Sequence, residues 1–197
     1  PFGTEGFALY HQRVENIVDM LLNIELPQLR SVDIGNIRKI KALLAIFSTE
    51  VPMLVDITKL ATLTGIARTT ILAYLQYLHE AKLIRLLYSD DLSVKKMQKP
   101  DKILMENTNL LQALSLQVPN IGTMRETFFC NQLGYTHQVE YNKRGDYLIE
   151  HKYVFEIGGK AKDGKQVANM ENAYIASDEC DYPIGNKLPL WLFGLMY

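Results

Sequence analysis

The sequence predicts an α+β fold in which a helical N-terminal half precedes a smaller α/β domain. Apolar residues recur at helical spacing through the first 50 positions, whereas short strand-like runs dominate after residue 134. Hydrophobic residues make up 48% of the 197 positions and charged residues 22%, which is the composition of a globular protein. A disordered chain is therefore excluded.

Two amphipathic helices are predicted in residues 1–50. The first is expected to end near Pro27, and its apolar stripe consists of Val14, Ile17, Val18, Leu21 and Leu22. The second begins after Asp33, a residue suited to an N-cap, and its inward face consists of Ile37, Ile40, Leu43, Leu44 and Phe47. Because both stripes need a partner, residues 1–50 are predicted to be a helical lead-in to the next segment.

Residues 51–105 have the pattern of a winged helix. A short helix is followed by a tight turn at Gly65 and by a longer helix with apolar residues at helical spacing. Gly65 tolerates the positive φ that a sharp helix–helix turn requires. Residues 82–88 are then expected to form a strand and 102–105 a returning strand. A helix-turn-helix followed by a β-hairpin is the arrangement of a winged helix.

Residues 106–197 are predicted to form the α/β domain. Its expected helices cover 109–116, 124–133 and 166–172, and its expected strands cover 135–140, 146–150, 153–157 and 173–176. Helices that alternate with short strands in this way indicate a sheet with helical packing.

The charge balance weighs against a strongly basic nucleic-acid-binding protein. The chain has 21 Lys and Arg against 22 Asp and Glu, whereas binding to phosphates depends on clustered cations. If the winged helix contacts DNA, its second helix would supply Arg68, Thr69, Thr70 and Gln76, and its wing would supply Lys95, Lys96, Lys99 and Lys102. The alternative is a structural or protein-docking role.

Three carboxylates in the C-terminal half are candidates for a metal site. Asp146 and Glu156 fall in neighbouring predicted strands, after the helix that carries Glu126. Oxygen ligands of this kind suit Mg²⁺, which would activate a water for phosphodiester hydrolysis. Lys160 is the candidate lysine, although it lies about 6–7 Å further along an extended strand than position 158. The alternative is that both residues are structural, with Asp146 at the end of a turn or the start of a strand and Glu156 paired with a nearby lysine.

The sequence lacks the motifs of ATP hydrolysis, of histidine metal sites and of serine hydrolases. The residues before Lys160 do not form a phosphate-binding loop, so the chain is not expected to hydrolyse ATP, and the four histidines lack metal-ligand spacing. No G-x-S-x-G element is present. Two isolated cysteines favour a reducing, cytoplasmic setting, and no run of about 20 apolar residues predicts a membrane span.

Six strings resemble the C-terminal part of a family of prokaryotic AAA+-type ATPases, in particular a Bacteroidetes-like branch. They are Leu-Ile-Arg-Leu-Leu-Tyr at 83–88, Lys-Pro-Asp-Lys-Ile at 99–103, Glu-Asn-Thr-Asn-Leu-Leu at 106–111, Arg-Glu-Thr-Phe-Phe at 125–129, Phe-Glu-Ile-Gly-Gly-Lys at 155–160 and Leu-Pro-Leu-Trp-Leu-Phe-Gly at 188–194. In that family, an N-terminal ATP-binding module precedes a winged helix and a restriction-endonuclease-like domain of unknown role. The ATPase motifs are absent here.

The resemblance implies a function as well as a fold. Glu126, Asp146 and Glu156 match the family's acids, but the E-x-K element of active nucleases is here Glu156-Ile157-Gly158, without its lysine. The leading hypothesis is therefore a regulatory region with a degenerate nuclease-like site, which docks on the ATPase module and has DNA or another protein as further candidate partners. The alternative is a Mg²⁺-dependent DNA nuclease that uses the three acids and Lys160.

Overall fold

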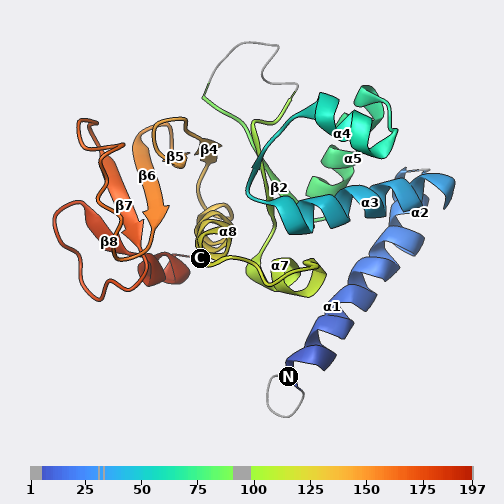
Figure 1. Ribbon diagram of the computed structural model, residues 1–197, viewed down its shortest axis with the longest axis horizontal. Coiled ribbons are helices and arrows are strands. Elements are labelled where there is room, and N and C mark those ends of the chain that lie inside the picture. The colour runs from blue at the N-terminus through green and yellow to red at the C-terminus, as the bar shows by residue number, and fades with distance from the viewer. Residues whose placement is uncertain (1–5, 31, 33, 91–98, 197) are drawn as a thin grey trace. The chain divides into compact units, whose positions relative to one another are not determined.

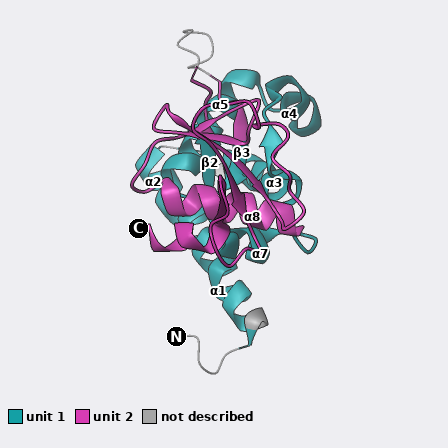
Figure 2. Cartoon of the chain, turned by 90° about the vertical axis from the view of Figure 1, so that its left-hand side faces the viewer, with its two compact units in different colours: residues 1–86, 103–119 teal, residues 87–102, 120–197 magenta. Residues whose placement is uncertain are grey.

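The computed structural model describes residues 6–30, 32, 34–90 and 99–196, and the chain divides into two compact units (Figures 1 and 2). Unit 1 comprises residues 1–86 and 103–119, and unit 2 comprises 87–102 and 120–197. Helices and two sheets together confirm the predicted α+β class. The unit boundaries differ from the predicted domain boundaries in two places. The segment 87–102, predicted as part of the winged helix, groups with the C-terminal residues, and the segment 106–119, predicted as part of the α/β domain, groups with unit 1.

Unit 1 is built around a layer of packed helices. These are α1 (Phe7–Met20), the π-helical turn η1 (Leu21–Glu25), α2 (Leu26–Arg30), α3 (Ile34–Glu50) and α7 (Thr108–Leu114). Helix α1 packs against α7, and α3 packs against both α7 and η1. A helix is expected to end near Pro27, but the helical segment continues past this residue to Arg30 in α2. Pro27 lies in the first turn of α2, where a missing N–H is tolerated.

The remainder of unit 1 holds two further helices and part of a small sheet. Asp56 accepts hydrogen bonds from two backbone N–H groups at the start of α4 (Ile57–Thr64), and Gly65 ends that helix with a φ of 66°. Helix α5 (Arg68–Glu80) follows. The sheet has the order β1-β3-β2, formed by β1 (Met53–Leu54), β2 (Ile84–Leu87) and β3 (Lys102–Met105). None of the helices in the described residues is long and apolar enough to cross a membrane.

Unit 2 contains a mixed five-stranded sheet with the order β4-β5-β6-β7-β8. Its strands are β4 (Val139–Tyr141), β5 (Tyr147–Ile149), β6 (Tyr153–Gly158), β7 (Ala173–Ser177) and β8 (Lys187–Pro189). Strands β4, β5 and β6 are antiparallel, whereas β6, β7 and β8 are parallel. Helix α8 (Ile121–Leu133) packs against β6 and against the 3-10 helix η2 (Leu190–Leu195).

The other face of this sheet is covered by the segment between β6 and β7. Val167 from that segment is buried with Leu148, Val154 and Ile175. The helix predicted at 166–172 is not formed, because the backbone makes successive turns in which the N–H of Val167 donates to the carbonyl of Gly164. Gly164 has a φ of 66°, which starts these turns rather than a helix.

Candidate functional site

Asp146 and Glu156 lie on neighbouring segments of the sheet of unit 2. Glu156 is in β6, and Asp146 immediately precedes β5, whose register pairs Tyr147 with Phe155. The backbone N–H of Asp146 donates to the carbonyl of Phe155 at 2.8 Å. Both acids lie near Lys162, because Glu156 pairs with its ammonium and the charge of Asp146 raises its pKa. The structure thus brings these two predicted residues to the same lysine.

Glu156 is buried, and one of its carboxylate oxygens has no hydrogen-bond partner among the described residues. The residue is 2% exposed, and its Oε1 lies 2.8 Å from the Nζ of Lys162, whereas its buried Oε2 accepts no hydrogen bond from any residue that the structure describes. A buried acceptor without a partner costs about 1–3 kcal/mol, so it calls for an explanation such as an ion. A hard cation such as Mg²⁺, which prefers carboxylate oxygens, fits this donor.

Lys162 occupies the space above Gly158, the position at which the E-x-K element lacks its lysine. A Cβ added to Gly158 would lie 2.8 Å from the Cβ and Cγ of Lys162. The stem of Lys162 therefore lies where a side chain at 158 would be, and its ammonium reaches Glu156. Lys160, which the strand pattern places near the acids, is exposed, and its carbonyl accepts a hydrogen bond from Lys187 Nζ at 2.6 Å.

The negative charge of Asp146 is disfavoured at its position. Burial raises the pKa of Asp146, the backbone N–H of Ile157 opposes this by donating to Oδ2 at 2.6 Å, and the charge of Glu126 raises the pKa further. The ammonium groups of Lys102 and Lys162 lower it, but less than burial raises it. A carboxylate under such conditions gains from a bound cation, because the cation stabilises the charged form.

The same cluster of charges keeps Lys162 protonated. Burial lowers the pKa of Lys162, but the hydrogen bond and the charge of Glu156, together with the charges of Asp146 and Glu126, raise it more. The net direction is upward from the ordinary value. A positive charge therefore remains beside the two acids at neutral pH, where it can contact an anionic group.

Helix α8 covers one face of this sheet. Its Phe129 lies 5.7 Å from the ring of Tyr147 and 5.1 Å from the ring of Phe155, measured between centroids. Successive residues of a strand point to opposite faces. Glu156, which follows Phe155 in β6, therefore points away from α8.

Glu126, the third predicted acid, is held on the α8 side. Its Oε2 accepts hydrogen bonds from the Tyr147 O–H and from Lys102 Nζ, both at 2.5 Å. Burial raises the pKa of Tyr147 well above its ordinary value, so the phenol stays protonated and donates. Glu126 thus influences Asp146 through its charge, while a hydroxyl and an ammonium occupy one of its own oxygens.

The predicted nucleic-acid-binding residues fall into two groups. Arg68, Thr69, Thr70 and Gln76 lie on α5, and Lys95 and Lys96 lie outside the described residues. In the first turn of α5, Arg68 and Thr69 are exposed and Thr70 is half-buried. A single arginine on this helix offers little neutralisation of phosphate charge.

The C-terminal end of α5 is occupied by contacts within unit 1. Arg30 pairs with Glu80, and its guanidinium carbon lies 5.6 Å from the ring centroid of Tyr77. Gln76 donates to the other carboxylate oxygen of Glu80 at 3.0 Å. Since these polar groups contact one another, the first turn of α5 is the part of the predicted surface that stays open to a ligand.

A second polar cluster, formed by Asp90, Glu140 and His151, was not anticipated from the sequence. The Nδ1 of His151 lies 2.9 Å from Glu140 Oε2 and 3.3 Å from Asp90 Oδ1. Within the described ranges, this is the one triple of His, Cys, Asp or Glu side chains whose ligand atoms all lie within 4.8 Å of one another. Its members are far apart in the sequence, so no spacing signal could have revealed it.

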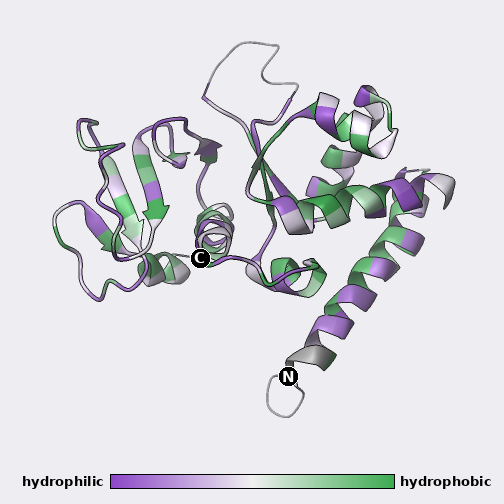
Figure 3. Cartoon of the chain, in the orientation of Figure 1, coloured by the Kyte–Doolittle hydropathy of each residue, from purple (hydrophilic) through white to green (hydrophobic). Residues whose placement is uncertain are grey.

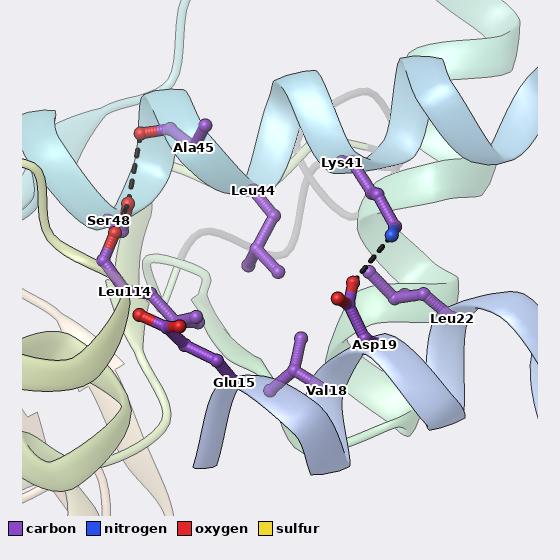
Figure 4. A pocket seen from close by; sticks show the side chains of 9 residues that line it. All are labelled: Glu15, Val18, Asp19, Leu22, Lys41, Leu44, Ala45, Ser48 and Leu114. Carbon is purple, nitrogen blue, oxygen red and sulfur yellow. Dashed lines mark hydrogen bonds and ion pairs between the residues drawn. The ribbon is translucent and has the colours of Figure 1, made fainter. Parts of the chain in front are cut away.

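Unit 1 contains a cavity of about 250 Å³ between α1 and α3 (Figure 4). Val18, Leu22 and Leu44 line its apolar part, and Asp19 of α1 faces Lys41 of α3 at its rim. The Asp19 and Lys41 side chains form an ion pair at 2.5 Å. The cavity is therefore lined by apolar side chains of the two helical segments, and one exposed ion pair lies at its rim.

Comparison with known proteins identifies a family for the N-terminal part of the chain. Residues 7–120 match a family described as a domain of unknown function, DUF8612. The match ends beside Pro119, the last residue of unit 1, so Glu126, Asp146, Glu156 and Lys162 lie beyond it. Neither a curated protein nor a solved structure matches the chain significantly. Because the matched residues cover more than half of its length, the chain belongs to the DUF8612 family.

Proposed function

We propose that unit 2 is a restriction-endonuclease-like domain in which Asp146, Glu156 and Lys162 form a Mg²⁺-dependent site for cleaving DNA. The observation that carries the proposal is the position of Lys162, whose stem fills the space above Gly158 and whose ammonium lies 2.8 Å from Glu156. Lys162, four residues after Gly158, thereby takes the place of the lysine that the E-x-K element lacks. The mixed sheet with α8 on one face supports the assignment of the fold.

Each of the three residues has a distinct chemical task in this proposal. The buried Oε2 of Glu156 and the carboxylate of Asp146 hold the cation, and the N–H of Ile157 fixes the orientation of Asp146. Bound Mg²⁺ would lower the pKa of a water and offset charge on the phosphate. Lys162 places a donor beside the reacting phosphate, where it stabilises the negative charge that develops.

A cleavage assay with the full 197-residue chain tests this proposal. We expect the chain to cleave linear and supercoiled DNA with Mg²⁺ or Mn²⁺ and to lose this activity in the presence of EDTA. Asp146→Asn is expected to abolish the activity, whereas Asp163→Asn, which changes an exposed aspartate bonded to Lys165, is expected to preserve it. Cleavage by the unmodified chain that does not exceed that of Asp146→Asn would contradict the proposal.

We also propose that the chain acts as the C-terminal region of an AAA+-type ATPase, with a winged helix in unit 1 that docks on the ATP-binding module of the parent polypeptide. The quoted strings support the family, and α4, Gly65, α5 and the β2–β3 hairpin support the winged helix. DNA remains a candidate partner through the first turn of α5. ATP would bind to the module that carries the phosphate-binding loop.

The docking proposal is favoured by the outer face of α1 and η1. Val18 and Leu22 of this helical segment are buried in unit 1, whereas Leu9, Ile17, Met20 and Ile24 are exposed. Figure 3 shows apolar positions alternating with polar positions along the segment. A helix with apolar residues on more than one side usually packs against other elements on more than one side. We propose that the ATP-binding module packs against the outer face of this helical segment.

We expect Ile17→Asp to weaken binding of the chain to the purified ATP-binding module at least about tenfold, because a charge would be buried in the contact. Isothermal titration calorimetry measures this affinity. Leu63→Asp is the matched control, since Leu63 is equally exposed but lies on α4. Equal binding by both variants and the unmodified chain would show that α1 does not form the contact.

A further inference from the structure

Lys102, a candidate DNA-binding residue of the predicted wing, is a buried lysine. It is the first residue of β3 and is 7% exposed, but it groups with unit 2. Its Nζ lies 2.5 Å from Glu126 Oε2 and 4.6 Å from the ring centroid of Tyr147. An ammonium group in such a site is held by its counter-charge and by the aromatic ring.

We propose that Lys102 is a positioning residue that holds Glu126 out of the cation site, so that Asp146 and Glu156 alone supply its carboxylate ligands. This inference rests on the proposed function of unit 2. It separates the three predicted acids into two metal ligands and one carboxylate that is neutralised by a lysine.

Three observations separate Glu126 from Glu156 and engage it with other groups. Helix α8, which carries Glu126, covers the face of the sheet to which Phe155 points, whereas Glu156, the next residue of β6, points to the other face. The Tyr147 hydroxyl and the Lys102 ammonium converge on the same oxygen of Glu126. Among the described residues, the three acids do not form a triple with all ligand atoms within 4.8 Å. Glu126 is therefore anchored to Lys102 and Tyr147.

The charges explain why this anchoring matters for a cation. With Lys102 paired to Glu126, the remaining groups Asp146, Glu156 and Lys162 carry one net negative charge. If Glu126 lost its lysine, the same region would carry two net negative charges and a third candidate ligand. Lys102 thus limits the site to two carboxylates and leaves the rest of the coordination to water and substrate, as Mg²⁺ prefers.

Mn²⁺ binding to the full chain, measured by isothermal titration calorimetry, tests the role of Lys102. Glu126→Gln leaves the Lys102 charge uncompensated near the site, and we expect it to weaken Mn²⁺ binding about tenfold. Adding Lys102→Met to that variant removes the uncompensated charge and is expected to restore affinity to within about twofold of the unmodified chain. Lys102→Arg, which keeps the charge, is expected to bind normally.

The outcomes separate this inference from the proposed function. If Glu126 were itself a ligand, removing the Lys102 charge would not replace the lost carboxylate, so the double variant would still bind Mn²⁺ much more than twofold more weakly than the unmodified chain, and the inference would be overturned. Equal binding by all variants would overturn it as well. An unmodified chain that does not bind Mn²⁺ would instead overturn the proposed function. Far-UV circular dichroism checks the fold of each variant, and the double variant leaves no buried charge without a partner.

Discussion

Lys162→Met is expected to slow Mg²⁺-dependent DNA cleavage about 100-fold or more, because the change removes the charged donor beside Glu156. Methionine keeps an apolar stem of similar length, so it still fills the space above Gly158. The fold of the loop should therefore survive. Single-turnover rates with the protein in excess over DNA measure the chemical step without a contribution from product release.

Lys160→Met is the matched control for this prediction. It removes the same charge two residues away, from an exposed side chain, and leaves intact the backbone carbonyl that accepts the hydrogen bond from Lys187. We expect the cleavage rate of this variant to stay close to that of the unmodified chain. If both substitutions slow cleavage equally, the lysines act through general attraction of DNA, and Lys162 has no specific role.

Moving the lysine back to the E-x-K position provides a positive test. In the variant Gly158→Lys/Lys162→Gly, the stem that would clash with a side chain at 158 is removed. Gly158 is not among the glycines with positive φ, so lysine is compatible with the backbone there. We expect this variant to regain part of the activity that Lys162→Met loses. Cleavage as slow as that of Lys162→Met would mean that position 158 cannot serve the site.

The positions of Asp146 and Glu156 beside neighbouring strands could be predicted because strand patterns are regular, whereas Lys162 was missed because loop geometry is not. The position of Lys162 depends on a turn after β6, in which its N–H donates to the carbonyl of Gly159 at 3.0 Å. Distances counted along an extended strand cannot reveal such a turn.

The fold shows the same division between regular and irregular segments. Helical periodicity predicted helices in the segments where α1, α3 and α5 lie. It did not predict the π-helical turn at Leu21–Glu25 or the continuation past Pro27, because one wide turn changes the phase of the stripe without leaving a distinct residue signal. The link between Lys102 and Glu126 was also beyond prediction, since it depends on the pairing of residues from segments that are separate in the sequence.

Arg85→Met is expected to lower the free energy of unfolding of unit 1 by about 3–5 kcal/mol, because it leaves a buried carboxylate without its counter-charge. Arg85 of β2 donates to Glu106 Oε1 at 2.5 Å, and the two side chains are 9% and 1% exposed. The double variant Arg85→Met/Glu106→Leu replaces both charges with apolar groups. We expect it to recover most of the lost stability, since buried ion pairs are often replaceable as a pair.

Chemical denaturation can locate this effect in unit 1. Far-UV circular dichroism follows mainly the helices of unit 1, whereas Trp191, the single tryptophan, lies in η2 and reports on unit 2. Arg30→Met is the control, because the Arg30–Glu80 pair is solvent-exposed, and such pairs contribute about 0–1 kcal/mol. If Arg85→Met costs no more than Arg30→Met, the Arg85–Glu106 contact adds little to folding. A larger loss of stability, recovered by the double variant, would show that each buried charge of the pair stabilises the fold only because it compensates the other.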